Sequence, residues 1–234
     1  MKIKIVGAAG GEVTGSAYYV QTKDAKILVD AGMFRGGKKS EAKNRLPSAV
    51  NLSELDSVLL THAHLDHTGR VPLLIKHGYT GRIFGTAATI ELAELILQDS
   101  ARLQVHEAEG ANRTRNFSAQ GPVEPLYGPE DVVPFRQMAQ PVQFREPVEV
   151  AKGISARWIE AGHILGSASI ELTGTEDGRS WTVLFSGDLG PIGAGPSFVT
   201  SIVRIGQTSY SSSLRTAIEI TDPIPTQSLS LKTW

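Results

Sequence analysis

The chain has 234 residues and a formal net charge of −1, with 41% hydrophobic and 20% charged residues and no cysteine. These values are typical of one or two globular domains, and they exclude a largely disordered chain, a polybasic nucleic-acid-binding protein, disulfides and thiolate metal sites. No apolar run approaches the roughly 20 residues that span a bilayer, and the N-terminus lacks a signal-peptide pattern, so we expect a cytoplasmic protein without a membrane partner.

Short runs rich in valine, isoleucine, leucine and tyrosine alternate with turn residues along the first 190 residues and predict strands. The predicted strands are Lys2–Gly7, Ala17–Gln21, Ile27–Asp30, Ser57–Thr61, Arg82–Phe84, Ser155–Ile159, Ser169–Leu172 and Thr182–Phe185. Strands at both ends with helices between them predict an α/β layered domain.

Two helices are predicted between these strands. Leucine and isoleucine recur at helical spacing over Ala87–Glu109, and Gly110 follows as a predicted stop. A shorter helix is expected after Gly69, with Pro72 in its first turn. Residues 111–150 are rich in proline and glutamine and are predicted to form a helix-and-loop excursion.

The segment that follows the strand at Ser57–Thr61 carries three histidines and an aspartate within six residues: His62, His64, Asp66 and His67. Imidazole and carboxylate are the ligands that zinc accepts when no thiolate is present. His62 and His64 lie two residues apart and can face one ion, whereas Asp66 and His67 fall on the next turn and can reach another. The spacing therefore predicts two metal ions rather than one.

Three further residues of ligand type follow predicted strands beside small residues. They are His163 in Gly162–Ser167, Asp188 in Ser186–Gly190, and Asp30 before Gly32. Each has an ordinary structural alternative, since His163 fits a buried core histidine and both aspartates fit turn residues. Beside the 62–67 cluster, His163 and Asp188 become candidate ligands, and Asp30 a candidate acceptor that orients a ligating histidine.

The pattern His62-x-His64-x-Asp66-His67, with Asp30 before it and His163 and Asp188 after it, resembles the metallo-β-lactamase superfamily. Further segments are similar to its β-CASP branch of RNA-cleaving nucleases, and these segments are Gly10–Ser16, Asp99–Ala101, Pro125–Tyr127 and Gly162–Ser167. The resemblance covers residues 1–190. It implies an αββα sandwich with a dinuclear metal site at one edge.

The resemblance also implies a role for each residue at a matching position. His62, His64 and His163 would hold one zinc ion, and Asp66 and His67 the other. Asp188 would bridge the two ions, and a water between them would attack phosphorus. Asp66, as a ligand, and Asp30, by orienting the cluster, are the residues expected to serve catalysis.

The amino-acid composition changes after about Gly190, where serine, threonine, isoleucine and proline become frequent and no periodic pattern is found. Residues 191–234 are therefore not expected to form a domain. The branch would continue with a strand carrying ESTYG and a β-CASP domain, and neither is present. Ser213–Ala217 can be written AGT CTA CGT ACG GCA, which after a G reads GAG TCT ACG TAC GGC and encodes ESTYG. We therefore expect that the tail arose from a reading-frame slip and that the sandwich is incomplete.

The function expected from these observations is zinc-dependent cleavage of RNA phosphodiester bonds, with RNA as the partner and homodimer formation left open. The chain as printed is expected to be weakly active or inactive, because the second domain is missing. Two alternatives stay open. One is a small-molecule metallo-hydrolase acting on a thioester or lactam, and the other is a non-catalytic remnant.

Overall fold

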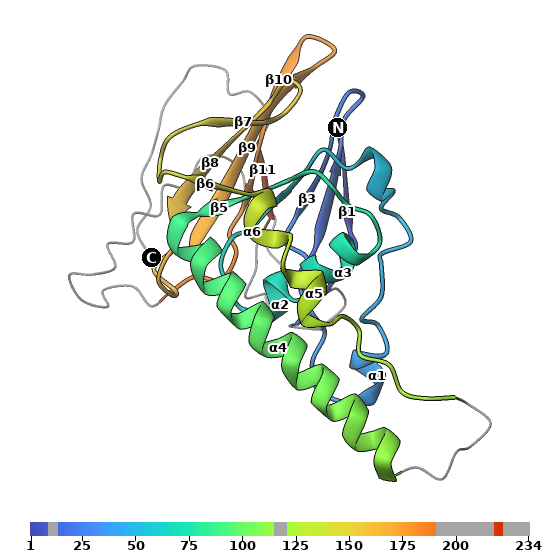
Figure 1. The fold of residues 1–234 in the computed structure, drawn as a ribbon. Coiled ribbons are helices and arrows are strands. Elements are labelled where there is room, and N and C mark those ends of the chain that lie inside the picture. The colour runs from blue at the N-terminus through green and yellow to red at the C-terminus, as the bar shows by residue number, and fades with distance from the viewer. Residues whose placement is uncertain (9–13, 115–120, 191–217, 222–234) are drawn as a thin grey trace.

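The computed structural model of the chain describes residues 1–8, 14–114, 121–190 and 218–221 and arranges their strands in two sheets (Figure 1). The first sheet contains, in spatial order, β1 (Lys2–Ile5), β2 (Tyr18–Gln21), β3 (Lys26–Val29), β4 (Ser57–Leu59), β5 (Arg82–Thr86) and β6 (Ala139–Val142). The strands β1 to β3 are antiparallel neighbours, and β3 to β6 run parallel. The parallel arrangement brings the carboxyl ends of β3, β4 and β5 to one edge.

The second sheet is antiparallel throughout. Its strands are, in spatial order, β11 (Ile218–Thr221), β10 (Arg179–Phe185), β9 (Ala168–Glu176), β8 (Ile154–Glu160) and β7 (Val148–Ala151). The turn between β9 and β10 is Asp177–Gly178, and both residues have positive φ, as the commonest two-residue hairpin turn requires. Both strands continue up to this Asp-Gly turn and are therefore longer than predicted.

The helices lie against the first sheet and against one another (Figure 1). They are α1 (Lys38–Glu41), the 3₁₀ helix η1 (Leu52–Glu54), α2 (Leu65–Thr68), α3 (Val71–Lys76), α4 (Ala87–Thr114), α5 (Pro129–Val132) and α6 (Phe135–Met138). One hydrophobic core lies between these helices and the first sheet, and a second core lies between the two sheets. The predicted α/β layered domain is confirmed, with helix, sheet and sheet as the layers of the described residues.

Two local predictions are wrong. The helix predicted to stop at Gly110 continues to Thr114, and beyond Gly110 the side chain of Asn112 both donates to and accepts from the backbone of Val123. The 111–150 excursion also contains β6 and β7 in addition to two short helices. Glutamine and proline made β6 resemble a loop, but β6 is the last strand of its sheet, where Pro141 need not donate to a further neighbour.

The glycine at position 110 offers a test of this helix. A Cβ added there would meet only the Arg113 guanidinium, at 3.9 Å. Alanine has less backbone freedom to lose on folding than glycine, so we expect Gly110→Ala to raise the free energy of unfolding by about 0.5–1 kcal/mol. Urea denaturation followed by circular dichroism measures the change, and a lower stability would contradict the helical assignment.

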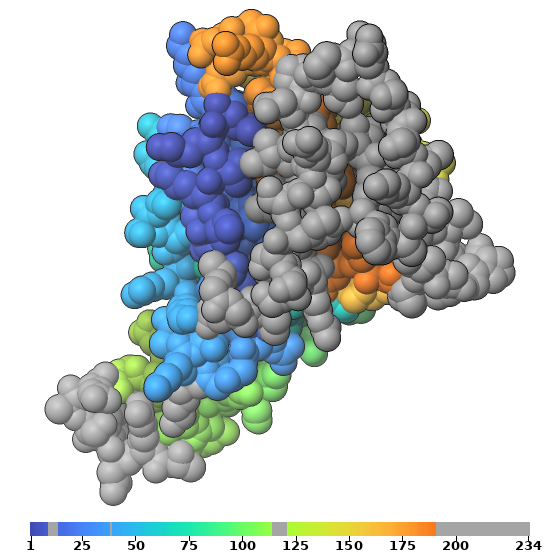
Figure 2. All heavy atoms as spheres, turned by 180° about the vertical axis from the view of Figure 1, so that it is seen from behind, coloured from blue at the N-terminus to red at the C-terminus, as the bar shows by residue number. Residues whose placement is uncertain are grey.

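The two sheets are tied together near the edge where β4 ends. The buried indole Nε1 of Trp158 donates to the carbonyl of Leu60 over 3.0 Å, and the amide of Ala168 donates to the carbonyl of Thr61 over 2.9 Å. At the opposite end of the strands, the amide of Lys23 donates to Glu176 over 2.8 Å. Figure 2 shows the β9–β10 hairpin beside the N-terminal strands at that end.

The buried guanidinium of Arg70 connects three loops through their backbone carbonyls. Arg70 is 2% exposed, and it donates to the carbonyls of Gly15, Gly32 and Arg45. Its Cζ also lies 5.0 Å from the centre of the Phe34 ring. Burial lowers the pKa of Arg70 to about 10, so the side chain stays charged at neutral pH.

Replacing Arg70 by methionine should destabilise the chain. The variant fills similar space but leaves the buried Gly32 carbonyl without its donor, so we expect the free energy of unfolding to fall by about 1–3 kcal/mol. Arg179→Met, at an exposed position in the β9–β10 hairpin, is the matched control and should change little. Equal stability of the two variants in urea would show that the Arg70 contacts contribute nothing.

Most of the predicted aberrant tail, residues 191–217 and 222–234, lies outside the described residues, as do residues 10–13 of the segment Gly10–Ser16. Of the chain after Gly190, the structure describes only β11, which pairs with β10 in antiparallel register.

Candidate metal centre

Four segments deliver the predicted ligands to one edge of the two sheets. His62 and His64 follow β4, Asp66 and His67 lie on α2, and His163 follows β8, while Asp188 follows β10. Both sheets end at this edge, so segments more than 120 positions apart in the sequence meet there. The structure therefore brings the candidate residues together, and their role as ligands stays a prediction.

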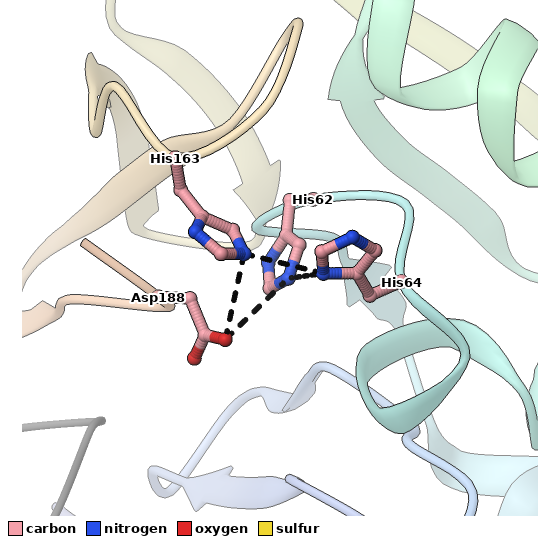
Figure 3. Close-up of side chains that lie close together, drawn as sticks. All are labelled: His62, His64, His163 and Asp188. Carbon is pink, nitrogen blue, oxygen red and sulfur yellow. Dashed lines mark hydrogen bonds and ion pairs between the residues drawn. The ribbon is translucent and has the colours of Figure 1, made fainter. Parts of the chain in front are cut away.

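Four of these side chains form a compact cluster (Figure 3). One ligand atom from each of His62, His64, His163 and Asp188 lies within 4.8 Å of the others. His64 Nδ1 is 3.2 Å from His62 Nε2 and 3.2 Å from His163 Nε2. Asp188 Oδ2 lies 3.6 Å from His163 Nε2 and 4.0 Å from His62 Nε2.

This donor set fits a zinc ion. A tetrahedral site with bonds of about 2.0–2.1 Å places ligand atoms about 3.3–3.4 Å apart, close to the nitrogen separations found here. A neutral imidazole has one donor and one acceptor nitrogen, so three ring nitrogens that face one point do not satisfy one another by hydrogen bonding. A cation at that point would satisfy all of them together with the carboxylate.

His67 lies beside His62, with the ring centres 4.1 Å apart. Its Nε2 is 3.4 Å from Asp188 Oδ1, while Asp188 Oδ2 faces the four-residue cluster. One oxygen of the carboxylate thus faces His67 and the other faces His62 and His163, as in a residue that bridges two ions. Asp66 is half-buried on α2 and lies outside the four-residue cluster, with its backbone carbonyl accepting from the Ser16 amide over 2.9 Å.

Asp30 lies behind the cluster and is fully buried. Its Oδ2 accepts from His67 Nδ1 over 2.7 Å and from the Thr61 hydroxyl over 2.8 Å, and its Oδ1 accepts from the Thr61 amide over 2.9 Å. Asp30 has a φ of 57°, a left-handed conformation that aspartate tolerates better than most residues. Protein donors thus occupy both oxygens of Asp30, and its predicted role as an acceptor that orients a histidine stays a prediction.

The pKa values of the histidines in the centre shift in opposite directions. Burial, helped by the nearby charge of His67, lowers the pKa of His62 to about 2. Burial also lowers the pKa of His163, although the carboxylates of Asp188 and Asp66 oppose that shift. Burial opposes protonation of His67 too, but Asp30 and Asp188 outweigh it and raise the pKa to about 10 in the metal-free chain. His62 and His163 are therefore neutral, which is the form that binds a metal.

One contact residue was not assigned a role from the sequence. Thr61 is 1% exposed, and its hydroxyl oxygen lies 3.0 Å from His62 Nδ1 as well as 2.8 Å from Asp30. The available signal was a hydroxyl residue at the end of a predicted strand and directly before the first histidine. Two other histidines lie apart from the centre: His77 caps the end of α3, and His106 is exposed on α4.

The fold and the centre define an α/β sandwich with a candidate metal site at the edge where its sheets end. Residues 10–225 match the family model described as the metallo-beta-lactamase superfamily. The chain belongs to this superfamily, which confirms the predicted family and fold.

Two curated relatives have longer chains than this one. Ribonuclease TTHA0252 of Thermus thermophilus is 38% identical over 81% of this chain and 38% of its own length. Transcription termination factor FttA of Cenarchaeum symbiosum is 36% identical over 68% of this chain and 23% of its own length. The chain therefore spans less than half the length of these relatives.

Among solved structures, the native FEZ-1 metallo-beta-lactamase of Legionella gormanii is 15% identical with a TM-score of 0.47, over 81% of this chain and 63% of that chain. Among the described residues, even the 28-residue helix α4 lacks the apolar stretch that a membrane-spanning helix requires.

Proposed function

We propose that the chain carries the metal centre of a zinc-dependent RNA phosphodiesterase of the β-CASP branch. The observation that carries the proposal is the convergence of His62, His64, His163 and Asp188 on one point, with the second oxygen of Asp188 facing His67. RNA is the favoured substrate class because relatives 36% and 38% identical are named a transcription termination factor and a ribonuclease.

The residues of the centre would divide between two zinc ions. His62, His64 and His163 would hold one ion, Asp66 and His67 the other, and Asp188 would bridge them. When bound, the ions supply a water activated for attack and positive charge that offsets the charge of the phosphate oxygens. Asp30 fixes the orientation of His67 by accepting from its Nδ1.

The centre is open enough for a polymer to reach it. The side chains of His163 and Asp188 are 26% and 17% exposed, so the donors lie near the surface. Leu165 and Leu189, in the loops that carry these two residues, are 62% and 45% exposed. A phosphate presented from outside, as in an RNA backbone, can approach such a site without entering an enclosed pocket.

The tail remains part of the proposal. We propose that residues after Gly190 derive from a shifted reading frame and that RNA cleavage by the 234-residue chain is weak or absent. The reason is that the chain covers only 38% and 23% of the lengths of the two relatives named a ribonuclease and a transcription termination factor. The DNA sequence tests this proposal, since a frame that encodes ESTYG and continues into a β-CASP domain would support it. A DNA sequence with no such frame would contradict it.

The experiment for the function combines metal analysis with RNA cleavage. The 234-residue chain and the protein with its reading frame restored are loaded with zinc, and cleavage of an end-labelled RNA is followed with and without chelator. We expect two zinc ions per chain and chelator-sensitive cleavage by the restored protein. His163→Ala should lose zinc and activity, whereas His106→Ala, at an exposed position on α4, is the matched control.

The other outcomes favour the alternatives. Hydrolysis of a thioester or lactam with no cleavage of RNA would indicate a small-molecule hydrolase. Zinc binding with no turnover in the restored protein would indicate a non-catalytic product. Absence of zinc from both proteins would contradict the metal centre itself. Sedimentation of the same samples would report whether a homodimer forms.

A further inference from the structure

The buried hydroxyl of Thr61 lies between the two groups of histidines. Thr61 Oγ1 is 2.8 Å from Asp30 Oδ2 and 3.0 Å from His62 Nδ1. Asp30 Oδ2 is also 2.7 Å from His67 Nδ1. The four groups are almost completely buried, with residue exposures of 0–1%. Water is therefore excluded from these contacts, and each polar atom must find its partner within the protein.

The directions of these hydrogen bonds follow from what each group can donate. A carboxylate only accepts, so the single proton of the Thr61 hydroxyl is donated to Asp30. The oxygen of Thr61 is then left to accept a hydrogen bond. His62 Nδ1, at 3.0 Å, is nearer to it than His67 Nδ1, which lies 3.4 Å away and already donates to Asp30. A histidine that carries its proton on Nδ1 has its lone pair on Nε2. His62 Nε2 is the atom that faces His64 and Asp188 in the candidate metal centre.

We propose that Thr61 is a positioning residue that couples His62 to Asp30, so that one buried carboxylate holds a proton on Nδ1 of both His62 and His67. His67 contacts Asp30 directly, whereas His62 contacts it through the Thr61 hydroxyl. The proposal rests on the proposed function only in taking His62 Nε2 as a metal ligand. It gives Thr61 a role in presenting the Nε2 lone pair of His62 to an ion.

The backbone and side chain of Thr61 are held by both sheets. Its carbonyl accepts from the Ala168 amide over 2.9 Å, and its amide donates to Asp30 Oδ1 over 2.9 Å. A Cβ added at Gly187 would lie 2.8 Å from the Thr61 Cβ, so the turn that carries Asp188 packs directly on this residue. The hydroxyl therefore has a defined position, and a valine of the same shape can replace it without leaving a gap.

The test compares Thr61→Val, which removes the hydroxyl but keeps the shape, with Thr61→Ser, which keeps the hydroxyl. Nitrogen-15 spectra of the histidine rings are recorded on the metal-free 234-residue chain, and the His62 signals are assigned by their loss in His62→Gln. We expect His62 to carry its proton on Nδ1 in the wild type and in Thr61→Ser. In Thr61→Val the Nε2-protonated tautomer should become substantially populated.

Zinc binding gives a second measurement that does not depend on RNA cleavage. Loss of an outer hydrogen-bond partner of a ligating histidine typically weakens metal affinity by about 10- to 100-fold. We expect a weakening of that order in Thr61→Val and near-wild-type affinity in Thr61→Ser, both by isothermal titration calorimetry.

The outcomes separate this proposal from the proposed function. If RNA is not cleaved but the tautomer and zinc affinity change as expected, the function fails and the role of Thr61 stands. An unchanged tautomer and unchanged zinc affinity in Thr61→Val would overturn the proposal, as would equal losses in the serine and valine variants. If Thr61→Val does not fold, the wild-type spectrum still decides, because a His62 protonated on Nε2 in the metal-free chain contradicts the proposal.

Discussion

Replacement of Asp66 by alanine is expected to leave the chain with one zinc ion in place of two and to abolish most RNA cleavage. Asp66, His67 and the bridging Asp188 are the proposed ligands of the second ion, and His67 with one oxygen of Asp188 is too few to retain it. With a single ion, water activation and charge neutralisation both weaken, so we expect kcat to fall by at least about 10³-fold, or ~4 kcal/mol of barrier. Zinc content is measured on the 234-residue chain, and turnover on the protein with its frame restored.

The matched control is Asp24→Ala. Asp24 is an exposed aspartate in the turn between β2 and β3, at the end of the strands opposite the candidate centre. This variant should keep both zinc ions and full activity. RNA binding by Asp66→Ala should survive better than turnover, because a carboxylate repels phosphate. Near-wild-type activity in Asp66→Ala would refute the assignment of this residue.

Replacement of Asp30 by asparagine is expected to produce the largest loss of stability. Asparagine has nearly the same shape and also tolerates the left-handed backbone at this position, where φ is 57°. Its amide group must place an NH2 where the carboxylate now accepts from Thr61 or His67. Two donors would then face each other in a buried site, so we expect the free energy of unfolding to fall by about 3–5 kcal/mol.

A second aspartate at the end of the sheet opposite the candidate centre provides the comparison for Asp30. Asp56 accepts from the Lys26 amide over 2.7 Å, but its side chain is exposed to solvent. Asp56→Asn should therefore cost less than about 1 kcal/mol, since water replaces the lost interaction. Zinc affinity should fall only in Asp30→Asn. Equal stability of the two variants in urea would mean that the buried carboxylate does not organise the histidines.

Several strands were predicted correctly from local sequence patterns. The strands around residues 18–21, 26–29 and 57–59 were predicted to within about two residues, because apolar β-branched runs and flanking turn residues are local features. The β6 strand was missed because its residues, Ala139–Val142, form a strand only by pairing with β5, 53 or more positions earlier. The extension of α4 past Gly110 likewise depends on contacts beyond the helix, such as Asn112 with Val123.

The sequence by itself determined the family, the fold class and the set of candidate ligands, because the histidines and aspartates occur in a spacing that few other functions require. Only the tertiary structure decided how these residues meet, since His62 and His163 lie a hundred positions apart and come together through the meeting of two sheets. The tertiary structure also decided which oxygen of Asp188 faces which histidines, and it placed Thr61 between Asp30 and His62. Such contacts depend on rotamers and burial, and residue identity and spacing along the chain do not encode them directly.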